Sequence, residues 1–322
     1  MLRLPHRLLA LASELGLGIS LAIALGALRA EATTPPPPAL PPAEMTWFQA
    51  AVIGLVQGLT EFIPISSTAH LKVVPVALGW GDPGVTFSAV IQLGSIVAVV
   101  WYFWGDLWHL SRGSWAAIAK RDWQAEEFRI ALGIALGTIP IAVSGLLLKA
   151  LVPDLDNAPI RSLTAIALAS IVMGLLLGLA ERLGRRQRDF EHLNARDGVL
   201  MGVAQCLALV PGVSRSGATI TAGLLFMNLE RVTAARFSFL LGIPAITLAG
   251  LVQLKTDVID APDLGTAEIL PLIIGTVSAT IFSYLSIAWL IRFLQTQSTW
   301  VFVWYRTLFG LSILAMVLFQ QL

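Results

Sequence analysis

The apolar residues of this chain fall into long stretches that are separated by short polar segments. A helix that crosses a bilayer needs about 20 consecutive, mainly apolar residues. Six stretches beyond residue 45 approach that length, and they predict about six full transmembrane helices: 85–104, 130–149, 163–180, 237–254, 269–291 and 300–319.

Four further apolar stretches are shorter, and they come as two pairs. The first pair is 47–63 with 67–80, and the second is 198–210 with 216–229. A break rich in proline and serine splits each pair. Non-helical backbone at membrane depth is tolerated only where protein buries it or where it lines a watery cavity. We therefore predict an all-α polytopic membrane protein with two re-entrant helix–loop–helix hairpins.

The composition is typical of a membrane protein and argues against a nucleic-acid partner, a disulfide and a cysteine-based zinc site. Hydrophobic residues make up 56% of the chain and charged residues 13%, whereas a soluble domain carries about 25% charged residues. The formal net charge is +1, so bulk charge predicts no nucleic-acid partner. Cys206 is the only cysteine, which excludes an intrachain disulfide and a cysteine-based zinc site.

Residues 1–45 form a signal-like or anchor segment followed by a proline-rich linker. Basic residues near the start precede a long apolar run, and Ala30-Glu31-Ala32 matches the small-residue pattern of a cleavage site. Cleavage and retention both stay open, and in either case Met1 stays cytoplasmic while the linker lies outside. Residues 46–322 are predicted to form the membrane-embedded domain.

The second hairpin repeats the first, 148 positions later. Gly54, Gln57, Leu59, Ser66 and Thr68 match Gly202, Gln205, Leu207, Ser214 and Ser216 at that offset. The dipeptide at 87–88 then matches the one at 237–238. Several matches in the same order predict an internal duplication.

The charge of the connecting segments predicts the orientation of the two repeats. Basic residues favour the cytoplasm. Segments 105–129 and 182–197 are rich in arginine and lysine, whereas 255–268 has one lysine against four acidic residues. The first two segments are therefore predicted inside and the third outside, so the hairpins enter from opposite sides. In inverted-repeat membrane proteins, paired broken helices build the site near the midplane.

The first break, T-E-F-I-P-I-S-S-T-A-H at 60–70, gathers chemically active side chains. Ionisable groups at membrane depth are costly and face a cavity or a partner. Glu61 is a candidate base or metal ligand, and His70 is a candidate proton carrier near neutral pH. Ser66, Ser67 and Thr68 supply hydroxyls, although each also suits the cap of a following helix.

The second break, P-G-V-S-R-S-G-A-T at 211–219, adds a cation to these groups. The fork of donors on Arg215 suits phosphate oxygens, and Ser214, Ser216 and Thr219 add hydroxyls. Both breaks precede a helix, whose N-terminal N–H groups favour an anion. Together the breaks predict an oxyanion site with a nucleophile and an acid/base pair, which suits phosphoryl transfer. Arg306 lies inside an apolar run, and two roles stay open for it: its side chain snorkels to an interface, or it reaches the site.

The two break motifs resemble the signature regions of the bacterial undecaprenyl-diphosphate phosphatase (UppP/BacA) family, and the resemblance covers roughly 46–322. It implies hydrolysis of undecaprenyl diphosphate to undecaprenyl phosphate and phosphate, which recycles the lipid carrier for peptidoglycan and gives bacitracin resistance. It also implies a divalent cation, Mg²⁺ or Ca²⁺, and a site that opens to the outer face of the plasma membrane. The lipid and the membrane are the expected partners. A homodimer is a further possible assembly, because the sequence does not reveal the oligomeric state.

The family's E/Q-x-x-x-E motif falls on Gln57 and Glu61, with a glutamine where glutamate is commoner. This leaves one carboxylate and weakens any scheme in which both residues ligate metal. If 47–63 is helical, these two residues share a face, and the Gln57 amide is predicted to donate to the Glu61 carboxylate. Ala69 replaces the commoner glycine.

Two mechanisms and one rival function remain from the sequence. Ser67 attacks the terminal phosphorus with Glu61 as base, Arg215 holds the diphosphate and His70 handles a proton. Alternatively, His70 is the nucleophile and the serines bind phosphate. The rival is a transporter or flippase of a lipid phosphate or another anion, which inverted repeats also suit.

Overall fold

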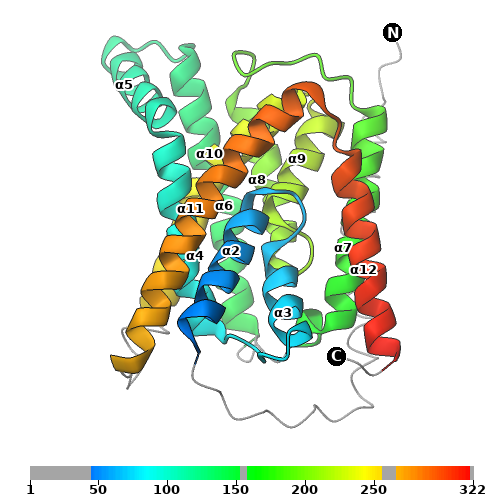
Figure 1. Cartoon of the computed structure of the whole chain (residues 1–322). Coiled ribbons are helices and arrows are strands. Elements are labelled where there is room, and N and C mark those ends of the chain that lie inside the picture. The colour runs from blue at the N-terminus through cyan, green and yellow to red at the C-terminus, as the bar shows by residue number, and fades with distance from the viewer. Residues whose placement is uncertain (1–44, 153–157, 256–265, 320–322) are drawn as a thin grey trace.

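The computed structural model describes residues 45–152, 158–255 and 266–319. The signal-like segment and most of the 255–268 connection, both subjects of sequence predictions, lie outside these residues. The described chain is all-helical, with no strand (Figure 1). Its helices are α2 (Trp47–Phe62), α3 (Ser67–Ala77), α4 (Val85–Tyr102), α5 (Trp104–Lys120), α6 (Glu126–Leu151), α7 (Leu163–Leu183), α8 (Ala195–Gln205), α9 (Arg215–Phe226), α10 (Arg231–Leu254), α11 (Thr266–Thr296) and α12 (Trp300–Leu318).

The predicted transmembrane helices are present. Within the described residues, α6, α7, α10, α11 and α12 are each long and apolar enough to cross a membrane. The pair α4 and α5 adds a sixth span if it is counted as one, although it bends by 65°. Many large apolar side chains on these helices are exposed, for example Leu146 at 64% and Leu308 at 61%, as expected of surfaces that lipid covers. The chain is a multi-pass membrane protein.

The short apolar stretches form two helical hairpins, α2 with α3 and α8 with α9. None of these four helices exceeds 16 residues, which is too short for a full span. Figure 1 shows α2 and α3 reaching the lower end of the molecule, while α8 and α9 lie in its upper half. The opposite placement agrees with inverted repeats. That the hairpins are re-entrant in a bilayer stays a prediction.

The beginnings of the two hairpins are built alike. α2 begins with a capping box in which Thr46 and Gln49 exchange hydrogen bonds with each other's backbone N–H groups. α8 begins with the same device, made by Asn194 and Asp197. Thr46 and Asn194 are 148 residues apart, which is the repeat offset, and so are Gln49 and Asp197. A capping box supplies partners for N–H groups that the helix itself leaves free. Because both hairpins begin with one at equivalent positions, the predicted duplication extends to local structure.

The packing of the hairpins also follows the repeat. Helix α2 crosses α11 so closely that a Cβ atom on Gly54 would lie 2.2 Å from the Gly275 carbonyl oxygen. Helix α8 crosses α6 in the same way, and a Cβ atom on Gly202 would lie 2.0 Å from the Gly137 oxygen. Only glycine permits such an approach. Each hairpin is thus held against a full-length helix of the bundle by a glycine contact.

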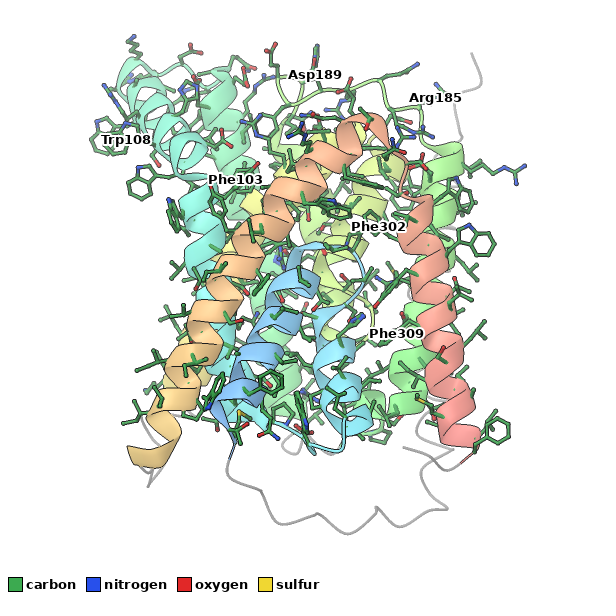
Figure 2. All side chains as sticks on the ribbon, in the orientation of Figure 1. Phe103, Trp108, Arg185, Asp189, Phe302 and Phe309 are labelled. Atoms are coloured by element: carbon green, nitrogen blue, oxygen red, sulfur yellow. The ribbon has the colours of Figure 1, made fainter. Side chains whose placement is uncertain are left out.

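Helix α5 differs from the sequence analysis, which treated 105–129 only as a basic connecting segment. It is an amphipathic helix that buries Leu110 and Ala117 and packs against α6. Its opposite face exposes Trp104, Trp108 and Trp115, and Figure 2 shows Trp108 pointing away from the bundle. The prediction missed the helix because charged residues interrupt its apolar pattern and hide a period of three to four residues.

Candidate active site

Glu61 lies in the last turn of α2, where three donors from both hairpins meet its carboxylate. The Ser67 hydroxyl donates to Oε2 over 2.7 Å, and the Gln57 amide donates to the same oxygen over 3.1 Å. The Arg215 guanidinium lies 3.4 Å from Oε1. The predicted hydrogen bond between Gln57 and Glu61 is confirmed. The carboxylate is buried and is held in one orientation.

Two of the three groups that converge on Glu61 occupy equivalent positions in the two repeats. Ser67 is the first residue of α3 and Arg215 is the first residue of α9, and 148 residues separate them. The two hairpins therefore bring a hydroxyl and a cation to the same carboxylate from helix N-termini. Exposed N–H groups and the positive end of the helix dipole accompany both side chains, so an anion is favoured there.

The residues that precede these helices have strained backbones. Ser66 has a φ of 76° and Ser214 a φ of 71°, in a region that non-glycine residues rarely occupy. The Ser214 hydroxyl caps α9 by accepting from the Gly217 N–H over 3.1 Å. Ser66 makes no side-chain cap bond, so capping does not account for it. Strained residues of this kind concentrate at functional sites.

A cavity of about 200 Å³ lies between the two breaks. Its lining includes six predicted site residues: Glu61, Ser66, Ser67, Thr68, Ser214 and Arg215. Helices α4, α6, α8 and α10 complete the wall. Apolar residues such as Leu209 and Ile246 line the cavity beside the polar ones. The cavity combines one carboxylate, one guanidinium and several hydroxyls in apolar surroundings, where electrostatic interactions are strong.

Three other predicted residues support the cavity wall and do not line it. Thr219 is fully buried, donates to the Arg215 carbonyl over 2.9 Å and lies 2.6 Å from the Ser238 hydroxyl. Ser216 donates to the Ile63 carbonyl over 3.3 Å and so links the second break to the first. Gln57 acts through Glu61, as described above.

His70 is not brought to the cavity. Its Nδ1 lies 2.7 Å from the Ser66 carbonyl oxygen, and its Nε2 lies 2.7 Å from the Tyr305 hydroxyl. The ring stacks on Phe309, with 4.2 Å between the centroids. Figure 2 shows Phe309 on α12, the helix beside α3 in this view. Both ring nitrogens therefore have partners away from Glu61.

Arg306, which sequence analysis left undecided, is fully buried and joins the two breaks. Its guanidinium donates to the Pro64 carbonyl over 3.0 Å, and to the Gly212 and Val213 carbonyls over 2.7 and 2.9 Å. A fourth bond runs to the Ser170 carbonyl on α7. Arg306 therefore neither snorkels nor lines the cavity. The available signal was a lone arginine within an apolar run, but its partners are distant in sequence.

A divalent cation, as the resemblance implies, would depend on Glu61. The described residues contain no group of three or more His, Cys, Asp or Glu side chains arranged to hold a metal. Mg²⁺ is nevertheless commonly held by one or two carboxylates together with phosphate oxygens of the substrate. A carboxylate beside a cavity that also contains a guanidinium and helix N-termini fits that kind of binding.

Comparisons with known proteins identify relatives that cover most of this chain. The family model described as "Bacitracin resistance protein BacA" matches residues 50–312. A protein of Trichormus variabilis named undecaprenyl-diphosphatase is 65% identical over 274 residues, which cover 85% of each chain. One of Synechocystis sp. with the same name is 65% identical over 267 residues, 83% of this chain and 81% of its own. One of Synechococcus elongatus is 62% identical over 273 residues, 84% of this chain and 93% of its own.

Proposed function

This chain belongs to the bacitracin resistance protein BacA family, and on that premise we propose that it hydrolyses undecaprenyl diphosphate to undecaprenyl phosphate and inorganic phosphate. The reaction recycles the lipid carrier of cell-wall synthesis and removes the diphosphate form that bacitracin sequesters. The observation that supports it is the contact of Ser67 with Glu61, 2.7 Å apart, with Arg215 on the other carboxylate oxygen.

Ser67 is the nucleophile in this proposal, and Glu61 is its base. Glu61 takes the hydroxyl proton while Ser67 Oγ attacks the terminal phosphorus, and the bond to the bridging oxygen breaks. Undecaprenyl phosphate leaves, and the proton passes from Glu61 to the departing phosphate. A water molecule, activated by Glu61, then cleaves the phosphoserine, and the proton returns to Ser67 as phosphate forms. Arg215 and the N-termini of α3 and α9 stabilise the charge on the phosphoryl oxygens.

The geometry favours Ser67 over His70 as the nucleophile. Ser67 lines the cavity and touches the base, whereas His70 has both ring nitrogens engaged elsewhere. The role of His70 in this proposal is to fix the first break, since it binds the Ser66 carbonyl. If a divalent cation binds, Glu61 and the diphosphate oxygens would hold it, and it would neutralise phosphate charge.

The test is phosphate release from undecaprenyl diphosphate by the purified protein in detergent, without any gradient. Ser67→Ala and Arg215→Ala are each expected to lower kcat at least about a hundredfold, the scale for losing a catalytic group or a charge partner. Ser111→Ala, on the exposed face of α5, is the matched control and should keep full activity. A phosphoenzyme that survives acid would support Ser67, because phosphohistidine is acid-labile. Near-normal turnover of Arg215→Ala would remove its role as phosphate clamp.

The same assay separates the enzyme from the transporter, because a transporter releases no phosphate from the lipid in detergent. The catalytic groups all come from one chain, so the proposal does not depend on a homodimer, which stays a prediction.

Our proposal for location is the bacterial plasma membrane, with the site opening to the outer face. It rests on the charge of the connecting segments. A cysteine at Asp82, in the exposed α3–α4 connection, should react with an impermeant thiol reagent in intact cells, whereas one at Glu191 should be protected. Cys206 is replaced first. The opposite labelling pattern would overturn the orientation.

A further inference from the structure

We propose that Gln205 binds the diphosphate group of the substrate through its side-chain amide, an inference that rests on the phosphatase activity proposed above. Gln205 ends α8, is fully buried and lines the cavity with Glu61 and Arg215. Neither Nε2 nor Oε1 has a hydrogen-bond partner. It is the only side chain of the described residues with two such orphaned buried atoms.

Comparison with the first repeat shows which intramolecular partner Gln205 lacks. Gln205 is equivalent to Gln57, whose amide donates to Glu61 over 3.1 Å and to Ser95 over 3.4 Å. The residue equivalent to Glu61 in the second repeat, 148 positions later, is Leu209. Leu209 also lines the cavity and offers no acceptor. The second repeat therefore keeps the glutamine and lacks its carboxylate.

A buried amide without partners is unfavourable, so a function has to account for it. Most buried polar side-chain atoms in folded proteins are hydrogen-bonded, and exceptions often mark binding or catalytic positions. Gln205, Arg215 and Ser214 line the same cavity, so the amide lies in the wall beside a guanidinium and a hydroxyl. All three supply donors, and the ligand that matches convergent donors is one rich in acceptor oxygens, such as a phosphate or diphosphate. Gln205 Nε2 would donate to one of those oxygens.

The assignment predicts that Gln205 affects substrate affinity more than the chemical step. A hydrogen bond to a charged group corresponds to about a 10- to 100-fold change in binding. In Gln205→Leu, KM for undecaprenyl diphosphate in detergent should rise by that factor, while kcat stays within about threefold. The dissociation constant of inorganic diphosphate, measured by calorimetry without turnover, should rise in parallel.

Thermal stability distinguishes binding from a structural role. Removing two orphaned polar atoms from a buried position is neutral or stabilising in the free protein. Tm of Gln205→Leu in detergent should therefore equal or exceed that of the unchanged protein, whereas a structural glutamine would lower it. Gln205→Met, which keeps an unbranched side chain, repeats the measurement if the leucine variant does not fold. Gln124→Leu, in the exposed α5–α6 connection, is the control.

The experiments distinguish failure of the Gln205 inference from failure of the proposed phosphatase function. If the unchanged protein releases no phosphate, the proposed function is wrong. If it is active, and Gln205→Leu and Gln205→Met keep the original KM and diphosphate affinity, the inference is overturned. A fall in Tm with unchanged KM would equally overturn it in favour of a structural role.

Discussion

Arg306 offers a sharp test of how the two hairpins are held in register. Replacement by methionine keeps a long side chain and removes every donor. Three carbonyl oxygens of the breaks, on Pro64, Gly212 and Val213, then lose the guanidinium that binds them. An orphaned buried polar group costs about 1–3 kcal/mol. Taking the lower figure for each oxygen gives a loss of about 3 kcal/mol.

That loss converts into a measurable change in melting temperature. For a domain of this size class, 1 kcal/mol corresponds to about 2–4 °C in Tm, so Arg306→Met should melt about 6–12 °C lower in detergent. Pro64 precedes Ser67 by three residues, and Gly212 precedes Arg215 by three. A shift of about 1 Å in either break would lower kcat about a hundredfold. Arg306→Lys retains a charge and three donors. Its Tm and kcat should therefore lie between those of the unchanged protein and those of Arg306→Met.

The matched control is Arg292→Met, which replaces an exposed arginine on α11. Differential scanning fluorimetry and phosphate release are measured on the same preparations. If Arg306→Met melts within about 2 °C of the unchanged protein and keeps its kcat, the four carbonyl contacts do not hold the breaks, and the reasoning is refuted.

Two further predictions concern Glu61 and the glycine crossings. Gln57→Glu should stay active but depend more strongly on Mg²⁺ or Ca²⁺, because two adjacent buried carboxylates resist ionising together, whereas Glu61→Gln should be nearly inactive at every cation concentration. Phosphate release with and without a chelator checks both, and rescue of Glu61→Gln by Gln57→Glu would show that Glu61 is not the unique base. Gly54→Ala should lower Tm by several degrees, since its Cβ would overlap a backbone oxygen of α11. Gly105→Ala, which meets no atom within 4 Å, should raise Tm slightly or leave it unchanged; equal Tm changes in the two variants would contradict the close crossing.

The spans, the two short helical hairpins and the residues that converge on Glu61 could be predicted from the sequence alone, because bilayer physics acts locally. Apolar length distinguishes a full span from a short helix, and a polar residue within an apolar stretch is conspicuous wherever it occurs. The contact between Gln57 and Glu61 was also predictable, since a helix fixes the separation of residues four apart.

What only the tertiary structure decided is the direction in which each polar side chain points. His70 has the same motif and neighbourhood as Ser67, yet it turns to Tyr305 on α12, 235 residues away. Arg306 and Gln205 each lie in an apolar run, yet Arg306 binds four carbonyl oxygens, whereas Gln205 lies in the cavity wall with both amide atoms unpartnered. These outcomes depend on which helices pack together, and the energy of a buried polar group is set by partners that packing brings from distant parts of the chain.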